Sequence, residues 1–258
     1  MELLRQLNAF DLSSYVPVTF KKKKIGWINT YNEHDLPFSL RSESNIDIEK
    51  LINITHKNGC EENPELCPIF NYESLNPKIK FNHNRIFCKS KIFDIERKLL
   101  SKYGLPAYGV HCNVWSKTGK SILIHLAKRS KNLKKFPGMY DNLIAGGQPV
   151  DISIKDNLYK EAFEEAGLGS NQMCSMERSK TVHYIHNENK KLNSSVIFIY
   201  QLEKTEKMYF KNMDGEVEDF VSIEIDNLYQ ILEQKKLKPN CIIPIIDFFI
   251  LKKSRFYI

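Results

Sequence analysis

The 258-residue sequence has no apolar run that approaches the roughly 20 residues needed to span a membrane. Its first ten residues, MELLRQLNAF, lack the charged start and apolar stretch of a secretory signal. None of its six cysteines forms a Cys-x2-Cys pair, which disfavours a zinc site, and their wide spacing favours reduced thiols. We therefore expect a cytoplasmic protein that does not contact membranes.

An arginine-rich tract is also missing, and no basic run is interleaved with aromatic residues. The chain does carry a formal charge of +7, from 38 Lys and Arg against 31 Asp and Glu. Such a balance is compatible with nucleic acid, a membrane surface or a small polyanion as the partner. Because Lys, Asn, Ile, Phe and Tyr are all abundant, A/T-rich codons account for the excess. We predict no nucleic-acid partner.

The chain is long enough for one large or two modest domains. We expect a smaller α+β accessory domain over residues 1–104 and a main domain over residues 105–258. The elements expected in the first domain are a helix within 1–20 that ends in a turn at Pro17, strand entry at the basic run 21–24, a helix over 46–56, a loop over 59–80, an extended segment over 81–93 and a helix over 94–104.

The main domain is expected to be an α/β sandwich around a mixed sheet, because its pattern runs hairpin, strand, helix, strands, helix. The elements expected are strands over 110–115 and 121–127 with a turn at 116–120, a strand before a central helix, strands over 178–187, 194–203 and 217–224, and helices over 226–235 and 240–253.

An acidic helix is the most informative element of this domain. Glu161, Glu164 and Glu165 are spaced i, i+3, i+4, which places their carboxylates on one helical face. Carboxylates that close repel one another unless a cation lies among them, and Mg²⁺ is the usual hard cation where phosphates are the substrate. The residues alone leave open a surface helix with a solvated acidic face.

The ends of this helix and its buried side can also be predicted from the sequence. Ser153 or Asp156 could cap its start, and Gly167 can end it in the left-handed conformation. Its apolar side is formed by residues that repeat every four positions, namely Leu158, Ala162 and Ala166.

Residues 146–168 resemble the Nudix box, whose pattern is G-x5-E-x7-R-E-U-x-E-E-x-G-U, with U a bulky apolar residue. Three positions depart from it: Ile152 stands in place of the first Glu, Lys160 in place of Arg, and Ala162 is smaller than usual. The matching residues are Gly146, Glu161, Glu164, Glu165, Gly167 and Leu168.

The flanking segments are similar to one Nudix subfamily, related to the Nudix part of thiamine pyrophosphokinase fusion proteins. The similar segments are RSKNLKKFPGMYDNLIAGGQP, DGEVEDF and KPNC, and the likeness extends from about residue 105 to 253. Members of this subfamily tend to lack the first Glu of the box. The resemblance implies hydrolysis of thiamine diphosphate or its oxidised or damaged analogues to the monophosphate and phosphate.

The resemblance also implies roles for residues of the box. It implies Mg²⁺, with Mn²⁺ as the alternative, and a small-molecule diphosphate as the partner; it leaves the oligomeric state open. The catalytic residues expected are Glu161, Glu164, Glu165 and Lys160. The metal ligands expected are those three glutamates, the carbonyl of Ala145, and Glu216 and Glu218. The substrate-binding residues expected are Arg129, Tyr140, Asp141, Asn142, Gly146 and Gly147.

Several polar residues outside the box are weaker candidates. His111 and Asn113 alternate on one predicted strand and so share a face, where they could line the same cavity. His183 and His186 fall on opposite faces of a predicted strand, so we expect no zinc site there. The segment KPNC offers Lys238 and Asn240 as substrate contacts or as residues that fix the entry to the last helix.

Three other functions stay open. An isomerase of isopentenyl diphosphate shares this fold, but it needs a catalytic Cys shortly after Asn142, where residues 143–145 are Leu, Ile and Ala. A binding module with a decayed box, suggested by Ile152 and Lys160, would hold diphosphates without turnover. A hydrolase of dinucleoside polyphosphates or nucleotide sugars would carry the same fold and box.

Overall fold

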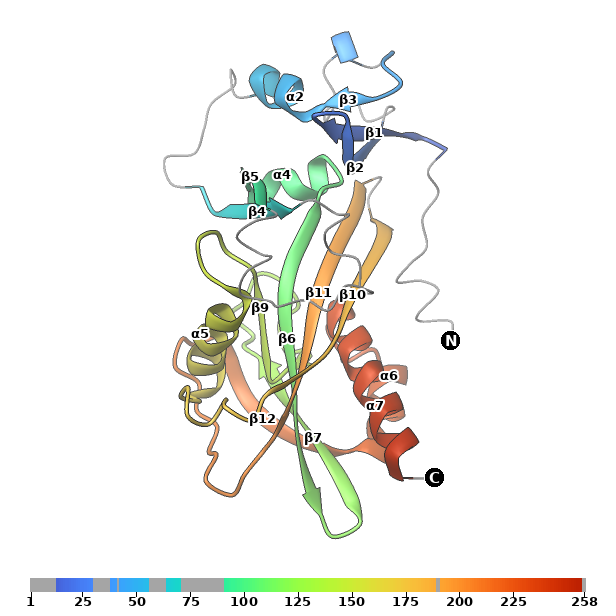
Figure 1. Ribbon diagram of the computed structural model, residues 1–258. Coiled ribbons are helices and arrows are strands. Elements are labelled where there is room, and N and C mark those ends of the chain that lie inside the picture. Colours follow the sequence, from blue (N-terminus) through green and yellow to red (C-terminus); the bar gives the residue numbers. More distant parts are fainter. Residues whose placement is uncertain are drawn as a thin grey trace. The chain divides into compact units, whose positions relative to one another are not determined.

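The computed structural model describes residues 13–29, 38–40, 42–55, 64–70, 91–188 and 191–256. The chain divides into two compact units (Figure 1). One unit comprises residues 1–108, 148–153 and 183–196, and the other comprises residues 109–147, 154–182 and 197–258. The expected domain boundary after residue 104 stays a prediction.

The first unit contains a small sheet, a hairpin and two short helices around one apolar core. The core takes side chains from every one of these elements, including the fully buried Val18, Leu51 and Ile69. The sheet has the order β2-β1-β3, and β4 pairs with β5. The elements are β1 (Tyr15–Phe20), β2 (Lys23–Asn29), η1 (Phe38–Leu40), β3 (Ile46–Asp47), α2 (Ile48–Thr55), β4 (Leu66–Phe70), β5 (Lys91–Glu96) and α4 (Arg97–Lys102).

Two expectations for this unit are wrong. Pro17 lies within β1 rather than in a turn, opposite Trp27 of β2. A proline is tolerated there because β3 pairs only with Val18 and Thr19, so Pro17 has a paired strand on one side only. The second error is the expected loop over 59–80, which contains β4. Its residues Cys67 and Ile69 are buried, and that burial outweighs the turn-like composition around them.

The basic run 21–24 forms the hairpin turn between β1 and β2, as strand entry predicts. Lys21 and Lys22 both have positive φ, 47° and 65°, and Phe20 pairs with Lys23. Two such residues form the tight turn that matches the twist of a hairpin. The predicted helices 46–56 and 94–104 correspond to α2 and α4. Residues 1–12, part of the first expected helix, lie outside the described residues.

The second unit is built on a seven-stranded mixed sheet of order β10-β11-β6-β7-β12, in which β8 pairs β7 and β9 pairs β6. Strands β6, β10 and β11 also contribute residues to the first unit. The elements are β6 (Pro106–Thr118), β7 (Ser121–Arg129), β8 (Tyr140–Asn142), β9 (Ile144–Gly147), α5 (Ile154–Ala166), β10 (Glu177–Glu188), β11 (Lys191–Glu203), β12 (Val217–Glu224), η4 (Ile225–Asn227), α6 (Leu228–Glu233), η5 (Pro239–Cys241) and α7 (Ile242–Phe256).

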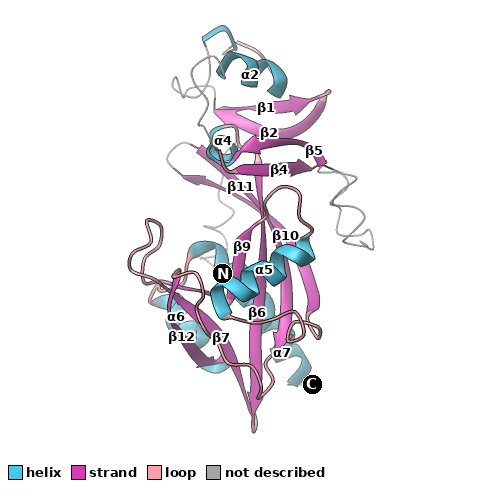
Figure 2. Ribbon diagram, turned by 90° about the vertical axis from the view of Figure 1, so that its left-hand side faces the viewer, coloured by secondary structure: helices cyan, strands magenta, loops and turns pink. Residues whose placement is uncertain are grey.

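Helices cover both faces of this sheet. Helix α5 lies on one face, and α7 lies on the other, as two perpendicular views show (Figures 1 and 2). The predicted α/β class is therefore confirmed, and so are the hairpin, the paired strands and the last two helices. No helix among the described residues is long and apolar enough to cross a membrane.

A close backbone contact in the first unit explains one of its glycines. Gly104 follows α4 with φ +56°, and a Cβ on it would lie 1.9 Å from the Trp27 carbonyl oxygen. That distance is impossible for a real side chain, so the backbone of β2 can approach only glycine here. Gly119, in the β6–β7 turn, has nearly the same φ of +60° but meets nothing within 4 Å.

We therefore expect Gly104→Ala to lower the free energy of unfolding by more than about 2 kcal/mol. Gly119→Ala is the matched control, since it carries the same left-handed penalty of about 1 kcal/mol without the clash. Differential scanning calorimetry of both variants measures the difference. Equal losses in the two variants would contradict the role of the close contact.

Candidate functional site

The acidic helix α5 has well-defined ends. It begins directly after Ser153, and it ends at Gly167, whose φ is +65°. The last carbonyls are closed by backbone bonds, 2.9 Å from the Gly167 N–H to the Phe163 oxygen and 3.0 Å from the Leu168 N–H to the Ala162 oxygen. A Cβ on Gly167 would also lie 2.9 Å from the Lys211 oxygen, so glycine fits here on two grounds.

Gly146 of β9 brings Glu161 onto the sheet. A Cβ on Gly146 would lie 2.1 Å from the Glu161 Cδ, so the carboxyl group occupies the space that a side chain would take. Only 14% of the Glu161 side chain is exposed. The match of Gly146 to the box pattern therefore has a steric cause, which is direct contact between the box glycine and a box glutamate.

Glu165 lies one helical turn further and is anchored to the preceding residue of the same strand. Its Oε2 accepts a hydrogen bond of 2.7 Å from the Ala145 N–H. Burial raises the pKa of Glu165 well above its usual range, and the neighbouring charges of Asp141 and Glu161 add to the rise. A carboxyl group placed this way is stabilised when it is protonated or when a cation lies beside it.

Lys160 takes the position that the box gives to Arg. Its ammonium lies 2.6 Å from Glu164 Oε2 and 3.3 Å from Glu161 Oε1. It therefore orients two glutamates as a point charge, without the planar fork of a guanidinium. The expected catalytic role of Lys160 is compatible with this geometry and stays a prediction.

A fourth carboxylate lies near the box. Burial raises the pKa of Glu161, and the like charges of Glu164 and Glu216 raise it further, while Lys160 lowers it. Glu216 is therefore close enough to act on Glu161 electrostatically. Glu218 instead faces basic side chains, 3.6 Å from Lys128 Nζ and 3.7 Å from Lys131 Nζ. Oxygen donors of this kind suit a hard divalent cation, so the residues present fit Mg²⁺.

Asp141 is the centre of a buried ionic network whose charges act on Glu165. Its Oδ2 faces two cations, the Lys238 ammonium at 2.7 Å and the Arg129 guanidinium at 3.1 Å. Its Oδ1 accepts from the Cys241 thiol at 2.5 Å and from the Asn142 N–H at 2.9 Å. Burial alone would raise the pKa of Asp141, but Lys238 and the other donors hold it below its usual range.

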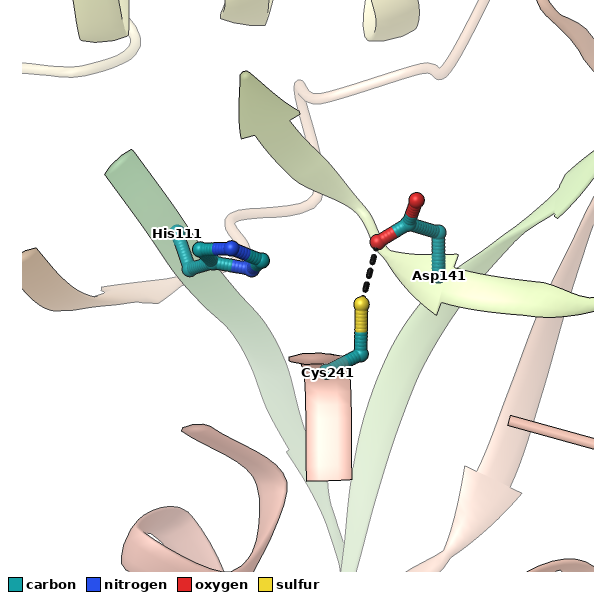
Figure 3. A group of neighbouring side chains, drawn as sticks. All are labelled: His111, Asp141 and Cys241. Atoms are coloured by element: carbon teal, nitrogen blue, oxygen red, sulfur yellow. Dashed lines mark hydrogen bonds between the residues drawn. The ribbon is translucent and has the colours of Figure 1, made fainter. Parts of the chain in front are cut away.

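The ligand atoms of His111, Asp141 and Cys241 lie within 4.8 Å of one another (Figure 3). Among the described residues, no other group of three potential metal ligands is gathered this closely. The box glutamates are not so close to one another, and Glu164 and Glu165 instead bond Lys160 and the Ala145 N–H. The trio does not suit a cation. Asp141 already faces two cations, and burial together with the Asp141 charge raises the pKa of Cys241 well above its usual range, so the thiol keeps its proton.

The remaining candidates are placed as follows. Tyr140 is half-buried, and its backbone N–H donates to the Lys236 carbonyl at 2.8 Å. The Gly147 carbonyl accepts from Asn157 Nδ2 at 3.0 Å. His183 bonds Ser194 and His186 stacks on Tyr184, so neither joins the other candidates.

The ion pair between Lys238 and Asp141 was missed by reasoning from sequence. The two residues are 97 positions apart, and nothing in the pattern of either segment pairs them. The one available signal was the segment KPNC, whose Lys238 and Cys241 both contact Asp141. The position of Asp141 as a buried anchor was also not visible in the sequence.

Comparison with known proteins gives curated relatives but no matching family model. The chain is 36% identical over 157 residues to Nudix hydrolase 20, chloroplastic, of Arabidopsis thaliana, covering 60% of this chain and 42% of that protein. It is 31% identical over 163 residues to Nudix hydrolase 24, chloroplastic, of the same plant, covering 63% and 45%. The chain thus spans less than half the length of these two relatives.

Two further matches were found. An uncharacterized protein of Saccharomyces cerevisiae, YJR142W, is 29% identical over 170 residues, which is 60% of this chain and 50% of that protein. Among solved structures, the Nudix domain of Shewanella oneidensis NrtR, complexed with ADP ribose, is 15% identical and covers 59% of this chain and 96% of that chain, with a TM-score of 0.45. The two named plant hydrolases support the predicted family, and the narrower subfamily stays a prediction.

We expect Gly146→Ala to weaken Mg²⁺ binding by about 10-fold or more, because the new methyl group must displace the Glu161 carboxylate. Isothermal titration calorimetry with Mg²⁺ measures the effect. Gly169→Ala is the control, since a Cβ there meets only the Gln172 Oε1 at 3.9 Å. An unchanged Mg²⁺ affinity in Gly146→Ala would remove Glu161 from the candidate ligands.

The raised pKa of Glu165 predicts the direction in which the stability of the fold changes with pH. A carboxyl whose pKa is raised in the folded state stabilises the fold below its unfolded pKa, about 4.5, and this stability is lost as pH rises through the folded pKa. In chelator, Glu165→Gln should therefore melt at least about 2 °C above wild type at pH 8, with the difference vanishing near pH 4. The exposed Glu233→Gln should show no such trend, and a Glu165→Gln variant that melts below wild type at pH 8 would contradict the assignment.

Proposed function

We propose that this chain, a Nudix hydrolase by its sequence relatives, cleaves a diphosphate bond in a small molecule with the aid of Mg²⁺, with Mn²⁺ as the alternative ion. The observation that carries the proposal is the contact between Gly146 and Glu161. It supports reading residues 146–168 as a working box, because a merely solvated acidic helix would not need a glycine beneath one of its carboxylates.

The principal metal ligands proposed are Glu161 and Glu165 of α5 and the Ala145 carbonyl, with either Glu164 or Glu216 as a further ligand. When bound, the ion would withdraw charge from the phosphate oxygens and acidify a water molecule. The Ala145 N–H holds Glu165, and Gly146 makes room for Glu161, so this chain's own backbone sets the spacing of the two principal carboxylates. Glu218 is the least suited of the predicted ligands, because Lys128 and Lys131 already face it.

The diphosphate is proposed to meet cationic side chains beside the box. Arg129 and Lys238 share the single negative charge of Asp141, so the group retains a net positive charge next to Glu165. Asp141 thereby serves the substrate by holding two cations in place rather than by touching phosphate. Of the other predicted substrate residues, Tyr140 is proposed to face the organic part, and Gly146 and Gly147 to line the approach. Asn142 is buried and donates to Asn113.

The proton of the attacking water needs a carboxylate acceptor. Glu164 is the candidate on the helix, since 37% of its side chain is exposed and Lys160 orients it. Glu216 is the candidate from the loop before β12. A glutamate already coordinating a cation is a poor base, so the choice between these two residues follows from which one binds the ion.

The substrate we propose is thiamine diphosphate or an oxidised or damaged analogue of it, which is converted to the monophosphate and phosphate. What supports this narrower proposal is the resemblance of the segments around the box, including KPNC, whose lysine and cysteine both contact Asp141. A cytoplasmic location and the absence of a nucleic-acid or membrane partner also stay proposals.

The test is release of phosphate and monophosphate with Mg²⁺ from thiamine diphosphate, its oxo analogue, ADP-ribose, a dinucleoside polyphosphate and isopentenyl diphosphate. We expect turnover of the thiamine compounds, abolished by chelator and lowered at least about 100-fold by Glu165→Gln, because that variant removes a ligand charge. The exposed Glu233→Gln is the matched control and should retain wild-type rates.

Other outcomes would change the proposal in defined ways. Turnover of nucleotides alone would retain the box and overturn the thiamine substrate. Binding of diphosphates without turnover would favour a non-catalytic module, which the replacement of the first box Glu by Ile152 would then explain. Wild-type rates in Glu165→Gln would remove the box from the active site.

A further inference from the structure

A buried relay of side-chain amides fixes the orientation of His111. Asn113 and Asn142 are 0% and 1% exposed, and His111 is 3% exposed. Asn113 Nδ2 donates to the Pro244 carbonyl at 2.9 Å, and Asn142 Nδ2 donates to Asn113 Oδ1 at 2.6 Å. Because a carbonyl oxygen can only accept, Pro244 determines which way the Asn113 amide points, and Asn113 in turn determines the Asn142 amide.

The relay determines which nitrogen of the His111 imidazole carries the proton. Asn142 presents its Oδ1 to His111 Nδ1 at 2.9 Å, and an amide oxygen only accepts. The Nδ1 nitrogen must therefore carry the proton and donate it. In the neutral ring this makes Nε2 the acceptor, with its lone pair free of hydrogen. Burial lowers the pKa of His111 to about 4, so the ring is neutral at physiological pH.

No described residue donates a hydrogen bond to this Nε2. The ring lies beside Asp141 and Cys241 (Figure 3), but the Cys241 thiol donates to Asp141 Oδ1 and the Lys238 ammonium donates to Asp141 Oδ2. The Nε2 acceptor is therefore left for a donor that the described residues do not supply. The Arg129 Nε is likewise without a hydrogen-bond partner among them, so the group is not closed on itself.

His111 is adjacent to the candidate active site. It is the register partner of Ala145 across the β6–β9 ladder, and the Ala145 N–H binds Glu165. The acceptor therefore lies one strand away from the residue that anchors the box glutamate. Arg129 and Lys238 both bind Asp141, and the ligand atoms of Asp141 and His111 lie within 4.8 Å of each other, so a diphosphate held by these two cations would bring its organic part close to the ring.

Burial selects the kind of donor. His111 is 3% exposed, so a cationic donor such as an ammonium group would have to lose its hydration to reach the ring. A neutral N–H or O–H group, such as an amino group on a heterocycle, suits a bare imidazole nitrogen in this surrounding.

We propose that His111 Nε2 accepts a hydrogen bond from a neutral N–H or O–H donor on the organic part of the diphosphate substrate. His111 is then a specificity-determining residue, and Asn113 and Asn142 position it through its tautomer. The inference rests on the proposed hydrolase function and adds to it the chemical feature by which the substrate is recognised.

The test compares thiamine diphosphate, which carries a ring amino group, with the analogue that lacks this group. Wild type should prefer the amino compound by about 10- to 100-fold in kcat/KM, since a site built for a donor rejects the analogue without one. His111→Leu should abolish the preference. His111→Gln, whose amide offers both a donor and an acceptor, should retain part of it.

The matched control is His125→Leu. His125 is also buried, but both its ring nitrogens are bonded, at 2.8 Å to Ser222 Oγ and 3.0 Å to Ser116 Oγ. Its loss should lower thermal stability and leave the preference for the amino compound intact. A preference that falls equally in both variants would assign a merely structural role to His111 and overturn the inference.

Binding measurements separate this inference from the proposed function. If no compound is turned over, calorimetric binding of the two compounds to wild type decides: selective binding of the amino compound supports the role of His111, and equal or no binding overturns it. Equal kcat/KM for both compounds would overturn the inference and leave hydrolysis intact. Stoichiometric Zn²⁺ in the purified protein, lost in His111→Leu, would assign Nε2 to a metal and also overturn it.

Discussion

The docking of α5 on β9 is the contact on which the candidate site depends. Two neighbouring residues of the strand receive two glutamates of the helix: Gly146 leaves room for the Glu161 carboxyl, and the Ala145 N–H binds Glu165. Both contacts bury negative charge, which is unfavourable without compensation. The buried carboxylates therefore destabilise the fold at this contact, and a bound cation would reduce that destabilisation.

The charges that act on Glu165 belong to two groups of opposite balance. In the box, Lys160 faces both Glu161 and Glu164, and the repulsion among the carboxylates favours a divalent ion. Around Asp141 the reverse holds, because two cations face one carboxylate. The excess of carboxylates in the box suits the proposed metal ion, and the excess of cations around Asp141 suits the proposed diphosphate.

Much of the site could be predicted from sequence, because local spacing sets local geometry. The positions of Glu161 and Glu165 on one helix turn, and of Gly167 beyond it, follow from helical periodicity alone. The network of Asp141, Lys238 and Cys241 could not be predicted in the same way, since its partners are about a hundred residues apart and meet only through the sheet. Pro17 misled the prediction because proline marks a turn only where no strand edge can accommodate it.

The missing side chain at position 146 has a consequence for how this sequence can change over generations. Any residue larger than glycine collides with the Glu161 carboxyl, but a shortened residue at 161 would vacate that space. A lineage that is losing the site can therefore accept a change at 161 first and a larger residue at 146 afterwards, whereas the opposite order passes through a clash. Relatives that have lost the glycine but kept the glutamate should be rare, because position 161 is expected to change before position 146.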